Sequence, residues 1–205
     1  MRTYLFLGDS ITDCNHYFDP EALGFGYVRM IHETLSKAQM PPQIINKGND
    51  GSTVSSVRRV WKNFCTELSP DLITILIGIN DLSVIFENQL TLSVALSEFR
   101  SRYEALIADI RQTTSCPILL METFVFPHPA YFASWKSPLA QMNQIISHLA
   151  KENNLYFLPL WESLTAAAKT YGYSALTTDG IHLTPQGHEL IATRWLTQLQ
   201  TVLPH

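Results

Sequence analysis

Short apolar runs alternate with longer segments of helical periodicity along this chain. Five of the runs consist mainly of β-branched, aromatic and leucine side chains, and they lack the apolar–polar alternation of a half-exposed strand. Continuous apolar character over so few residues is typical of a strand that is covered on both faces. The predicted strands are residues 3–7, 43–46, 72–77, 117–121 and 155–158.

Between these runs, apolar side chains recur every three or four residues, as they do on one face of a helix. Leu92, Leu96 and Phe99 show this spacing most clearly, and Thr184-Pro185 gives the last segment an N-cap and a first-turn proline. The predicted helices are residues 27–38, 55–67, 92–113, 135–153, 161–171 and 185–199. Strands that alternate with helices predict an α/β fold, in which a parallel sheet carries helices on both faces.

The composition excludes several classes of protein. Of the 205 residues, 46% are hydrophobic and 16% are charged, which fits one domain, residues 1–205, and excludes intrinsic disorder. The formal net charge of -4 and the scattered basic residues argue against binding to nucleic acid, which requires a basic surface. Because the sequence has no Cys-x-x-Cys pair, no paired histidine spacing and no glycine-rich nucleotide loop, we expect neither a metal nor a cofactor.

The hydrophobicity of the segments also predicts where the protein resides. The first apolar run, residues 4–7, ends at Gly8-Asp9 and is shorter than the apolar region of an export signal. No stretch approaches the roughly 20 apolar residues that a membrane-spanning helix needs. We therefore expect a cytoplasmic protein with three free thiols and no integral association with a membrane.

Glycines and small polar residues follow three of the predicted strands. Ligands of parallel α/β sheets bind beyond the carboxyl ends of the strands, so these segments are the first candidates for a site. A fourth segment, Asp179-Gly180-Ile181-His182, precedes the last helix and can reach the same edge of the sheet. The three strand-end segments are Gly8-Asp9-Ser10, Asn49-Asp50-Gly51-Ser52-Thr53 and Gly78-Ile79-Asn80-Asp81.

Together the four segments contain the groups that acyl transfer from an ester requires. Ser10 is the candidate nucleophile, His182 the candidate base, and Asp179 the group that orients the imidazole. The candidate oxyanion hole combines the side-chain amide of Asn80 with the backbone N–H groups of Ser10 and Gly51. Each segment also has a purely structural interpretation, because serine often caps a helix and the other segments are common in turns. Their joint occurrence in this order favours the catalytic interpretation.

The same segments resemble the motifs of the GDSL, or SGNH, hydrolases. The resemblance covers nearly the whole chain and departs from the family at none of its defining positions. It implies a three-layer α/β/α sandwich with a five-stranded parallel sheet, which is the flavodoxin-like arrangement of SGNH hydrolases. It also implies a catalytic triad of Ser10, Asp179 and His182, with Gly51 and Asn80 in the oxyanion hole.

Within that family, residues 9–14, 23–28 and 75–81 resemble a bacterial branch of acetylxylan-esterase-like and lysophospholipase-like enzymes. The resemblance implies a carboxylic ester hydrolase that removes short acyl groups, such as O-acetyl groups on a carbohydrate, through an acyl-enzyme intermediate. Two alternatives stay open: a lysophospholipase or thioesterase for longer acyl chains, and a non-catalytic module that binds a glycan or a partner. The expected partner is a small-molecule or glycan ester, and the surplus of aromatic residues is compatible with a homo-oligomer.

Further residues have more than one interpretation. Loops 13–26 and 123–137 are long for α/β connections, which often indicates function, and the second would form a pocket wall or an oligomer contact. Cys14 either lines the pocket or packs in the core, and Asp9 is expected to anchor the turn before Ser10. His188 is expected on the exposed face of the last helix. The four tryptophans are expected in the core or at an interface rather than stacked on sugar rings.

Overall fold

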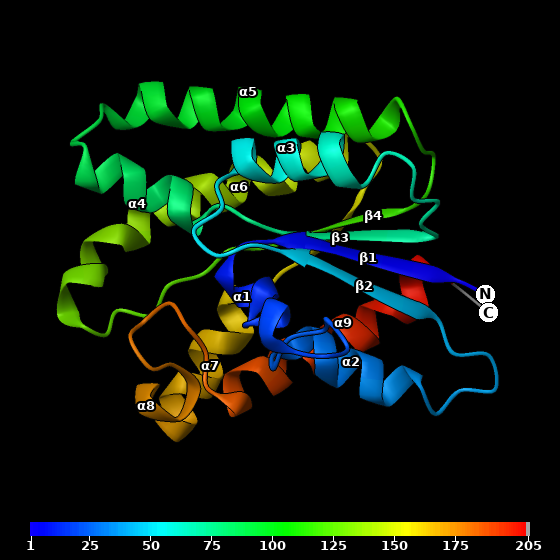
Figure 1. The fold of residues 1–205 in the computed structure, drawn as a ribbon. Coiled ribbons are helices and arrows are strands. Elements are labelled where there is room, and N and C mark those ends of the chain that lie inside the picture. Colours follow the sequence, from blue (N-terminus) through cyan, green and yellow to red (C-terminus); the bar gives the residue numbers. More distant parts are fainter. Residues whose placement is uncertain (204–205) are drawn as a thin grey trace.

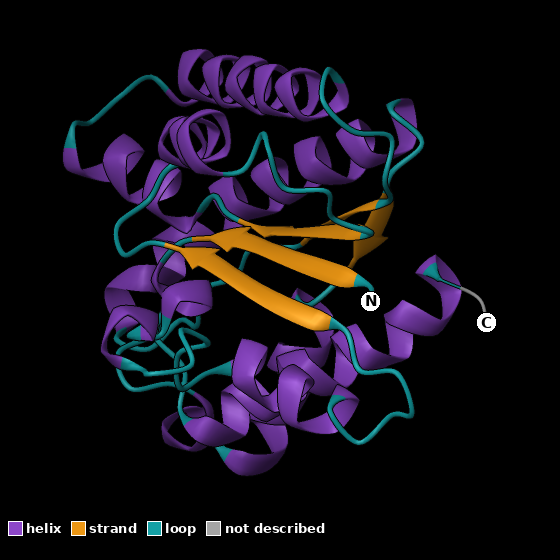
Figure 2. Ribbon diagram, turned by 45° about the vertical axis from the view of Figure 1, so that its right-hand side comes forward, coloured by secondary structure: helices purple, strands orange, loops and turns teal. Residues whose placement is uncertain are grey.

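A five-stranded parallel sheet lies between two layers of helices in the computed structural model, which describes residues 1–203 (Figures 1 and 2). The strand order is β2-β1-β3-β4-β5, the flavodoxin-like order of doubly wound folds. The predicted fold class is therefore confirmed. The strands are β1 (Thr3–Gly8), β2 (Gln43–Gly48), β3 (Leu72–Leu76), β4 (Ile118–Met121) and β5 (Tyr156–Leu158).

Each strand divides its side chains between two separate cores, one on each face of the sheet. In β1, Leu5 and Leu7 pack into one core, whereas Tyr4 and Phe6 pack into the other. All four side chains are buried. The apolar runs are continuous because both faces of the sheet are covered, so every residue of β3 and β4 is buried, as are positions 4–8 of β1.

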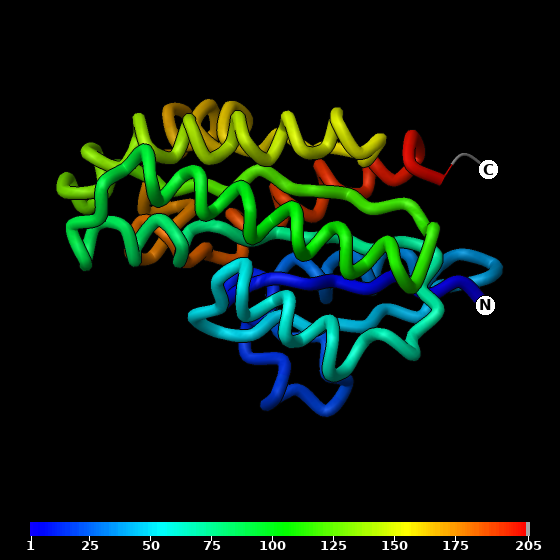
Figure 3. The backbone as a smooth tube through the Cα atoms, turned by 90° about the horizontal axis from the view of Figure 1, so that it is seen from above, coloured from blue at the N-terminus to red at the C-terminus, as the bar shows by residue number. Residues whose placement is uncertain are grey.

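The two helical layers are visible above and below the sheet in Figure 1. Seen from above, α3, α5 and α6 lie side by side over one face (Figure 3). That layer contains α3 (Val54–Phe64), α4 (Ile79–Glu87), α5 (Leu92–Arg111) and α6 (Lys136–Glu152). The other layer contains α1 (Ser10–Asp13), α2 (Tyr27–Leu35), α7 (Trp161–Tyr171), α8 (Tyr173–Leu176) and α9 (Pro185–Val202). Two short 3-10 helices, η1 (His16–Phe18) and η2 (Ala130–Trp135), lie within the two long loops.

All six predicted helices are present, and their ends differ from the prediction by at most three residues. The sequence pattern missed α4, because Asn80-Asp81 was interpreted as turn chemistry. Gly78, with a φ of +138°, precedes α4 and turns the chain sharply out of β3 into the helix. This backbone conformation is accessible mainly to glycine, and it places Asn80 and Asp81 in the first turn of α4, next to the end of the strand.

The tryptophans belong to the core, as expected. Trp61, Trp135 and Trp195 are buried, and Trp161 is partly buried. The indole Nε1 of Trp195 donates a hydrogen bond to Oγ1 of Thr74, 2.9 Å away, which satisfies a polar atom inside the second core. Across residues 1–203, no helix combines the length and the apolar character needed to cross a membrane.

Candidate active site

Ser10 begins α1 immediately beyond the carboxyl end of β1. Asp9 caps this helix, as predicted, by accepting a hydrogen bond of 3.0 Å from the backbone N–H of Ile11. The turn leaves no room for a side chain at Gly8, where a Cβ atom would lie 2.2 Å from Oγ1 of Thr12. The glycine and the aspartate of the first motif therefore set the geometry of the turn, and the serine hydroxyl is the group left free for chemistry.

Ser10, His182 and Asp179 form a continuous chain of hydrogen bonds. Oγ of Ser10 lies 3.0 Å from Nε2 of His182, and Nδ1 of His182 lies 2.6 Å from Oδ2 of Asp179. The side chains of His182 and Asp179 are about half exposed, at 51% and 52%. The imidazole is thus held between the hydroxyl and the carboxylate while the site stays open to solvent.

The local hydrogen bonds keep Asp179 ionised. Partial burial pushes the pKa of Asp179 upward, but hydrogen bonds from the His182 ring and from the backbone N–H groups of Ile181 and His182 outweigh it. The pKa of Asp179 is therefore held below its ordinary value of 3.8. An ionised carboxylate accepts the proton on Nδ1, which leaves Nε2 as the acceptor that faces the Ser10 hydroxyl.

Loop 123–137 supports the segment that contains Asp179 and His182. The backbone N–H of Phe126 donates to the carbonyl oxygen of Gly180 over 2.8 Å. Gly180 is pressed against the same loop, since a Cβ there would lie 2.4 Å from the carbonyl oxygen of His128. The loop therefore packs behind residues 179–182, and none of its residues lines the pocket that contains Ser10.

Asn80 and Gly51 lie on two segments that are joined to each other. Nδ2 of Asn80 donates a hydrogen bond of 2.9 Å to the carbonyl oxygen of Ser52. Gly51 has a φ of +67°, in the left-handed region that favours glycine. Among residues 1–203, no hydrogen bond links Ser10 to Gly51 or Asn80, and the backbone N–H groups of Ser10 and Gly51 have no protein acceptor. Both N–H groups are thus available to a ligand.

Two buried carboxylates lie beneath the site. Oδ2 of Asp81 accepts a hydrogen bond of 3.0 Å from the N–H of Val54, at the start of α3, whereas its Oδ1 has no partner among residues 1–203. Burial raises the pKa of Asp81 to about 6. Burial, together with the negative charge of Asp81, raises the pKa of Asp9 to about 7. Asn80 thus bonds to the 49–53 loop and Asp81 to the first residue of α3 that follows it, and the second contact is made by a carboxyl group in an apolar environment.

A pocket of about 310 Å³ opens over Ser10 and His182. The first long loop forms part of its wall, so of the two roles considered for Cys14, the structure shows the thiol at the pocket. The lining residues are Ser10, Ile11, Asp13, Cys14, Asn15, Asp50, His182, Leu183 and His188.

His188 was predicted on the exposed face of the last helix, and that prediction is wrong. Only 5% of the residue is exposed. Its Nδ1 accepts a hydrogen bond of 3.2 Å from the N–H of Tyr27, which places the ring proton on Nε2, 3.6 Å from Sγ of Cys14. Burial, assisted by the nearby His182, lowers the pKa of His188 to about 4. His188 is therefore a neutral part of the pocket wall.

Asn46 is a positioning residue that the sequence analysis did not identify. Its Nδ2 donates to the carbonyl oxygens of Thr12 (2.7 Å) and Leu23 (2.8 Å), and its Oδ1 accepts from the N–H of Gly48 (2.8 Å). These bonds connect α1, the first long loop and the end of β2. The available signal was an amide residue in an otherwise apolar run, since a buried amide must find partners for all its polar atoms.

The family model described as GDSL-like lipase/acylhydrolase matches residues 6–190. The chain belongs to this family. The resemblance noted in the sequence is thereby confirmed. Family membership and the match to an esterase over nearly the full length of the chain together identify it as a carboxylic ester hydrolase.

Several relatives are similar to this GDSL hydrolase along almost their entire chains. An acetylxylan esterase from Geobacillus stearothermophilus is 26% identical over 205 residues, which cover 95% of this chain and 92% of the relative. Its crystal structure has a TM-score of 0.82, with 97% of this chain and 94% of that chain covered. A protein from Parabacteroides merdae described as a GDSL-like lipase is 28% identical, with a TM-score of 0.84 and coverage of 96% and 94%. The Geobacillus enzyme has also been solved as catalytic mutants in which a serine or an aspartate is replaced by alanine.

Proposed function

We propose that this GDSL hydrolase is a serine esterase that removes acetyl and other short acyl groups from a carbohydrate. The observation that carries the proposal is the hydrogen-bonded chain of Ser10, His182 and Asp179 at the mouth of a pocket. The acetylxylan esterase activity named for the Geobacillus relative supports the substrate class.

The proposed reaction begins with attack of Oγ of Ser10 on the ester carbonyl while Nε2 of His182 takes the hydroxyl proton. The ionised Asp179 stabilises the imidazolium that forms. The backbone N–H groups of Ser10 and Gly51 and the amide of Asn80 donate hydrogen bonds to the oxyanion. His182 then returns the proton to the leaving alcohol, and a water molecule, activated by the same imidazole, hydrolyses the acyl-enzyme and releases the acid.

The lining of the catalytic pocket favours short acyl groups. Only two of its nine lining residues, Ile11 and Leu183, have aliphatic side chains, and most of the others are polar or charged. Transfer of each additional methylene from water to an apolar wall gains about 0.8 kcal/mol, and this pocket offers little such wall. A long-chain thioesterase or lysophospholipase would need an extended apolar channel beside Ser10.

A panel of esters tests the proposal. The wild-type protein should hydrolyse p-nitrophenyl acetate faster than the butyrate and octanoate esters, and it should release acetate from acetylated xylo-oligosaccharides. Ser10→Ala should lose at least about a thousandfold in kcat, and Asn80→Ala about a hundredfold or more. Ser101→Ala, which removes an exposed hydroxyl on α5, is the matched control.

Two results would contradict the proposal. A Ser10→Ala variant that keeps the wild-type rate would remove Ser10 as the nucleophile. A rate that increases steadily from acetate to octanoate would instead support hydrolysis of long acyl chains.

A further inference from the structure

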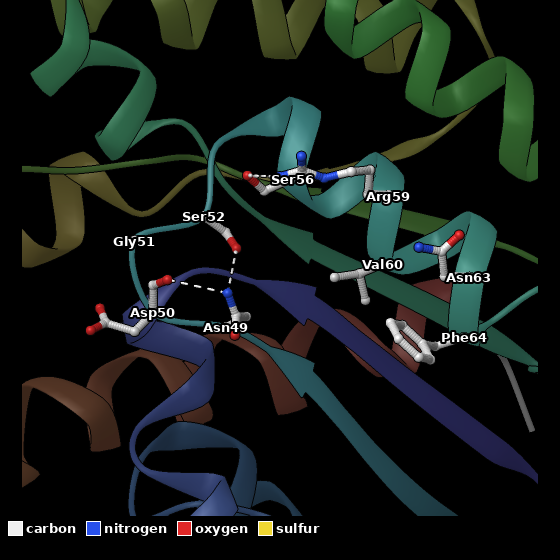
Figure 4. A pocket seen from close by; sticks show the side chains of 9 residues that line it. All are labelled: Asn49, Asp50, Gly51, Ser52, Ser56, Arg59, Val60, Asn63 and Phe64. Atoms are coloured by element: carbon white, nitrogen blue, oxygen red, sulfur yellow. Dashed lines mark hydrogen bonds between the residues drawn. The ribbon is translucent and has the colours of Figure 1, made fainter.

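A second pocket adjoins the catalytic one. It has a volume of about 230 Å³ and lies between the 49–52 segment and α3 (Figure 4). Asp50 lines both pockets, so the two pockets are neighbours on either side of this residue. The second pocket is therefore the hollow that the alcohol portion of an ester held at Ser10 would meet beyond Asp50.

One end of the second pocket carries an exposed aromatic ring. Phe64, the last residue of α3, is 66% exposed, although its neighbours Trp61 and Cys65 are buried. In Figure 4 its ring and the side chain of Val60 point into the same hollow. An aromatic face that remains open beside a groove offers a flat apolar platform for a ligand that also has an apolar face.

The remaining groups around the hollow are suited to hydroxyls. Four lining residues carry neutral amide or hydroxyl groups, namely Asn49, Ser52, Ser56 and Asn63. Arg59 is the only cationic residue of the lining, and its one hydrogen bond is to Oγ of Ser56, over 3.4 Å. Among residues 1–203 it has no carboxylate partner, so its N–H groups are available as donors.

This combination of groups favours a neutral sugar over an acyl chain or a phosphate. An alkyl chain would offer no partner to the amide of Asn63, which makes no side-chain hydrogen bond among residues 1–203, or to the guanidinium of Arg59, whose one bond is 3.4 Å long. A single guanidinium gives little of the charge that holds a phosphate, which usually has several cationic or backbone donors. A sugar ring has an apolar face for Phe64 and hydroxyls that can pair with the surrounding amides and with Arg59.

We propose that this second pocket is a glycan subsite that holds a sugar unit next to the unit whose ester is cleaved at Ser10. Phe64 stacks on the ring, and Asn63, Asn49 and Arg59 bind its hydroxyls. The proposal rests on the proposed function, because it assumes that the alcohol portion of the ester is a carbohydrate. If the second pocket holds a sugar, Phe64 determines the preference of the enzyme for oligosaccharides over small esters.

The test compares an acetylated xylo-oligosaccharide of several units with p-nitrophenyl acetate, which contains no sugar unit to occupy the second pocket. In Phe64→Ala, the ratio of kcat/KM for the oligosaccharide to kcat/KM for the small ester should fall roughly threefold to tenfold. Asn63→Ala should lower the ratio in the same direction. Tyr171→Ala, which removes another exposed aromatic ring (59% exposed) on the opposite helical layer, should leave the ratio at the wild-type value.

A binding measurement separates failure of the subsite from failure of the esterase proposal. Unacetylated xylotetraose is titrated into Ser10→Ala, with and without Phe64→Ala, and the Kd is measured by NMR. Weaker binding in the double variant supports the subsite even if the wild-type protein hydrolyses no acetylated sugar. The proposal would be overturned if Phe64→Ala changed neither the Kd for xylotetraose nor the ratio of the two kcat/KM values, whether both kcat/KM values stayed constant or fell by the same factor.

Discussion

The buried charge of Asp81 predicts that removal of this carboxylate stabilises the protein. Burial raises the pKa of Asp81 from 3.8 to about 6, so the folded state binds a proton more tightly than the unfolded state does. Stability from this group is therefore fully present below pH 3.8 and is lost as the pH rises through 6. Since one pKa unit corresponds to about 1.4 kcal/mol, ionised Asp81 lowers the free energy of unfolding by about 3 kcal/mol above pH 6.

Asp81→Asn is the substitution that isolates this charge. The side-chain oxygen of asparagine can still accept the hydrogen bond from Val54, but the residue carries no charge at any pH. We expect the free energy of unfolding of Asp81→Asn to exceed that of the wild type by up to about 3 kcal/mol at pH 8. The difference should shrink to near zero at about pH 4.

Urea unfolding at pH 4, 6 and 8 provides the measurement, with the two proteins compared at each pH. Glu67→Gln, which neutralises an exposed carboxylate without a partner in residues 1–203, is the matched control and should show little change at any pH. If Asp81→Asn is less stable than the wild type by the same amount at pH 4 and at pH 8, the reasoning from burial is refuted. Asp81 would then act only through the geometry of its hydrogen bond.

Three further substitutions test buried polar contacts, two of them near the site and one in the core. Asn46→Ala removes three hydrogen bonds and should lower the free energy of unfolding in urea by roughly 3 kcal/mol; a loss below about 1 kcal/mol would contradict the role of Asn46 in connecting α1, the first long loop and β2. The pKa of His188 is lowered from 6.5 to about 4, so this group destabilises the fold as the pH falls through that range. The stability of His188→Gln relative to the wild type should therefore rise by about 3 kcal/mol between pH 7 and pH 4, and a constant difference would speak against a buried neutral imidazole. Trp195→Phe leaves Oγ1 of Thr74 without its partner and should cost about 1–2 kcal/mol by thermal unfolding at pH 7; a neutral result would make the hydrogen bond dispensable.

The apolar pattern predicted the strands because a two-sided sheet leaves little ambiguity. Leu5 and Phe6 face opposite layers, so positions 4–7 of β1 are all apolar, and every residue of β3 except Thr74 is apolar. The helix α4 was missed because its start depends on a positive φ at Gly78 and on hydrogen bonds of Asn80 and Asp81 to another segment. Local propensity contains no information about such tertiary partners.

The residues of the candidate site also differ in how well the sequence predicts their positions. Ser10, Asp179 and His182 were predicted as a group because their motifs are short and their order along the chain is distinctive, and the structure joins the three side chains by hydrogen bonds. His188 was misplaced because its contacts come from distant parts of the chain: Tyr27 lies 161 positions away, and Cys14 lies 174 positions away. Helical periodicity gives the direction of a side chain around the axis, but it cannot show that a loop covers that direction.

The identity of the nucleophile is the central claim, and a serine-directed fluorophosphonate tests it most directly. The probe forms a stable covalent adduct with an activated serine, and mass spectrometry of the digested protein locates the modified residue. We predict one adduct, on the peptide that contains Ser10, no adduct in Ser10→Ala, and much slower labelling in His182→Ala, because the imidazole takes the hydroxyl proton. An adduct on a different residue, or equal labelling of wild type and Ser10→Ala, would contradict the account.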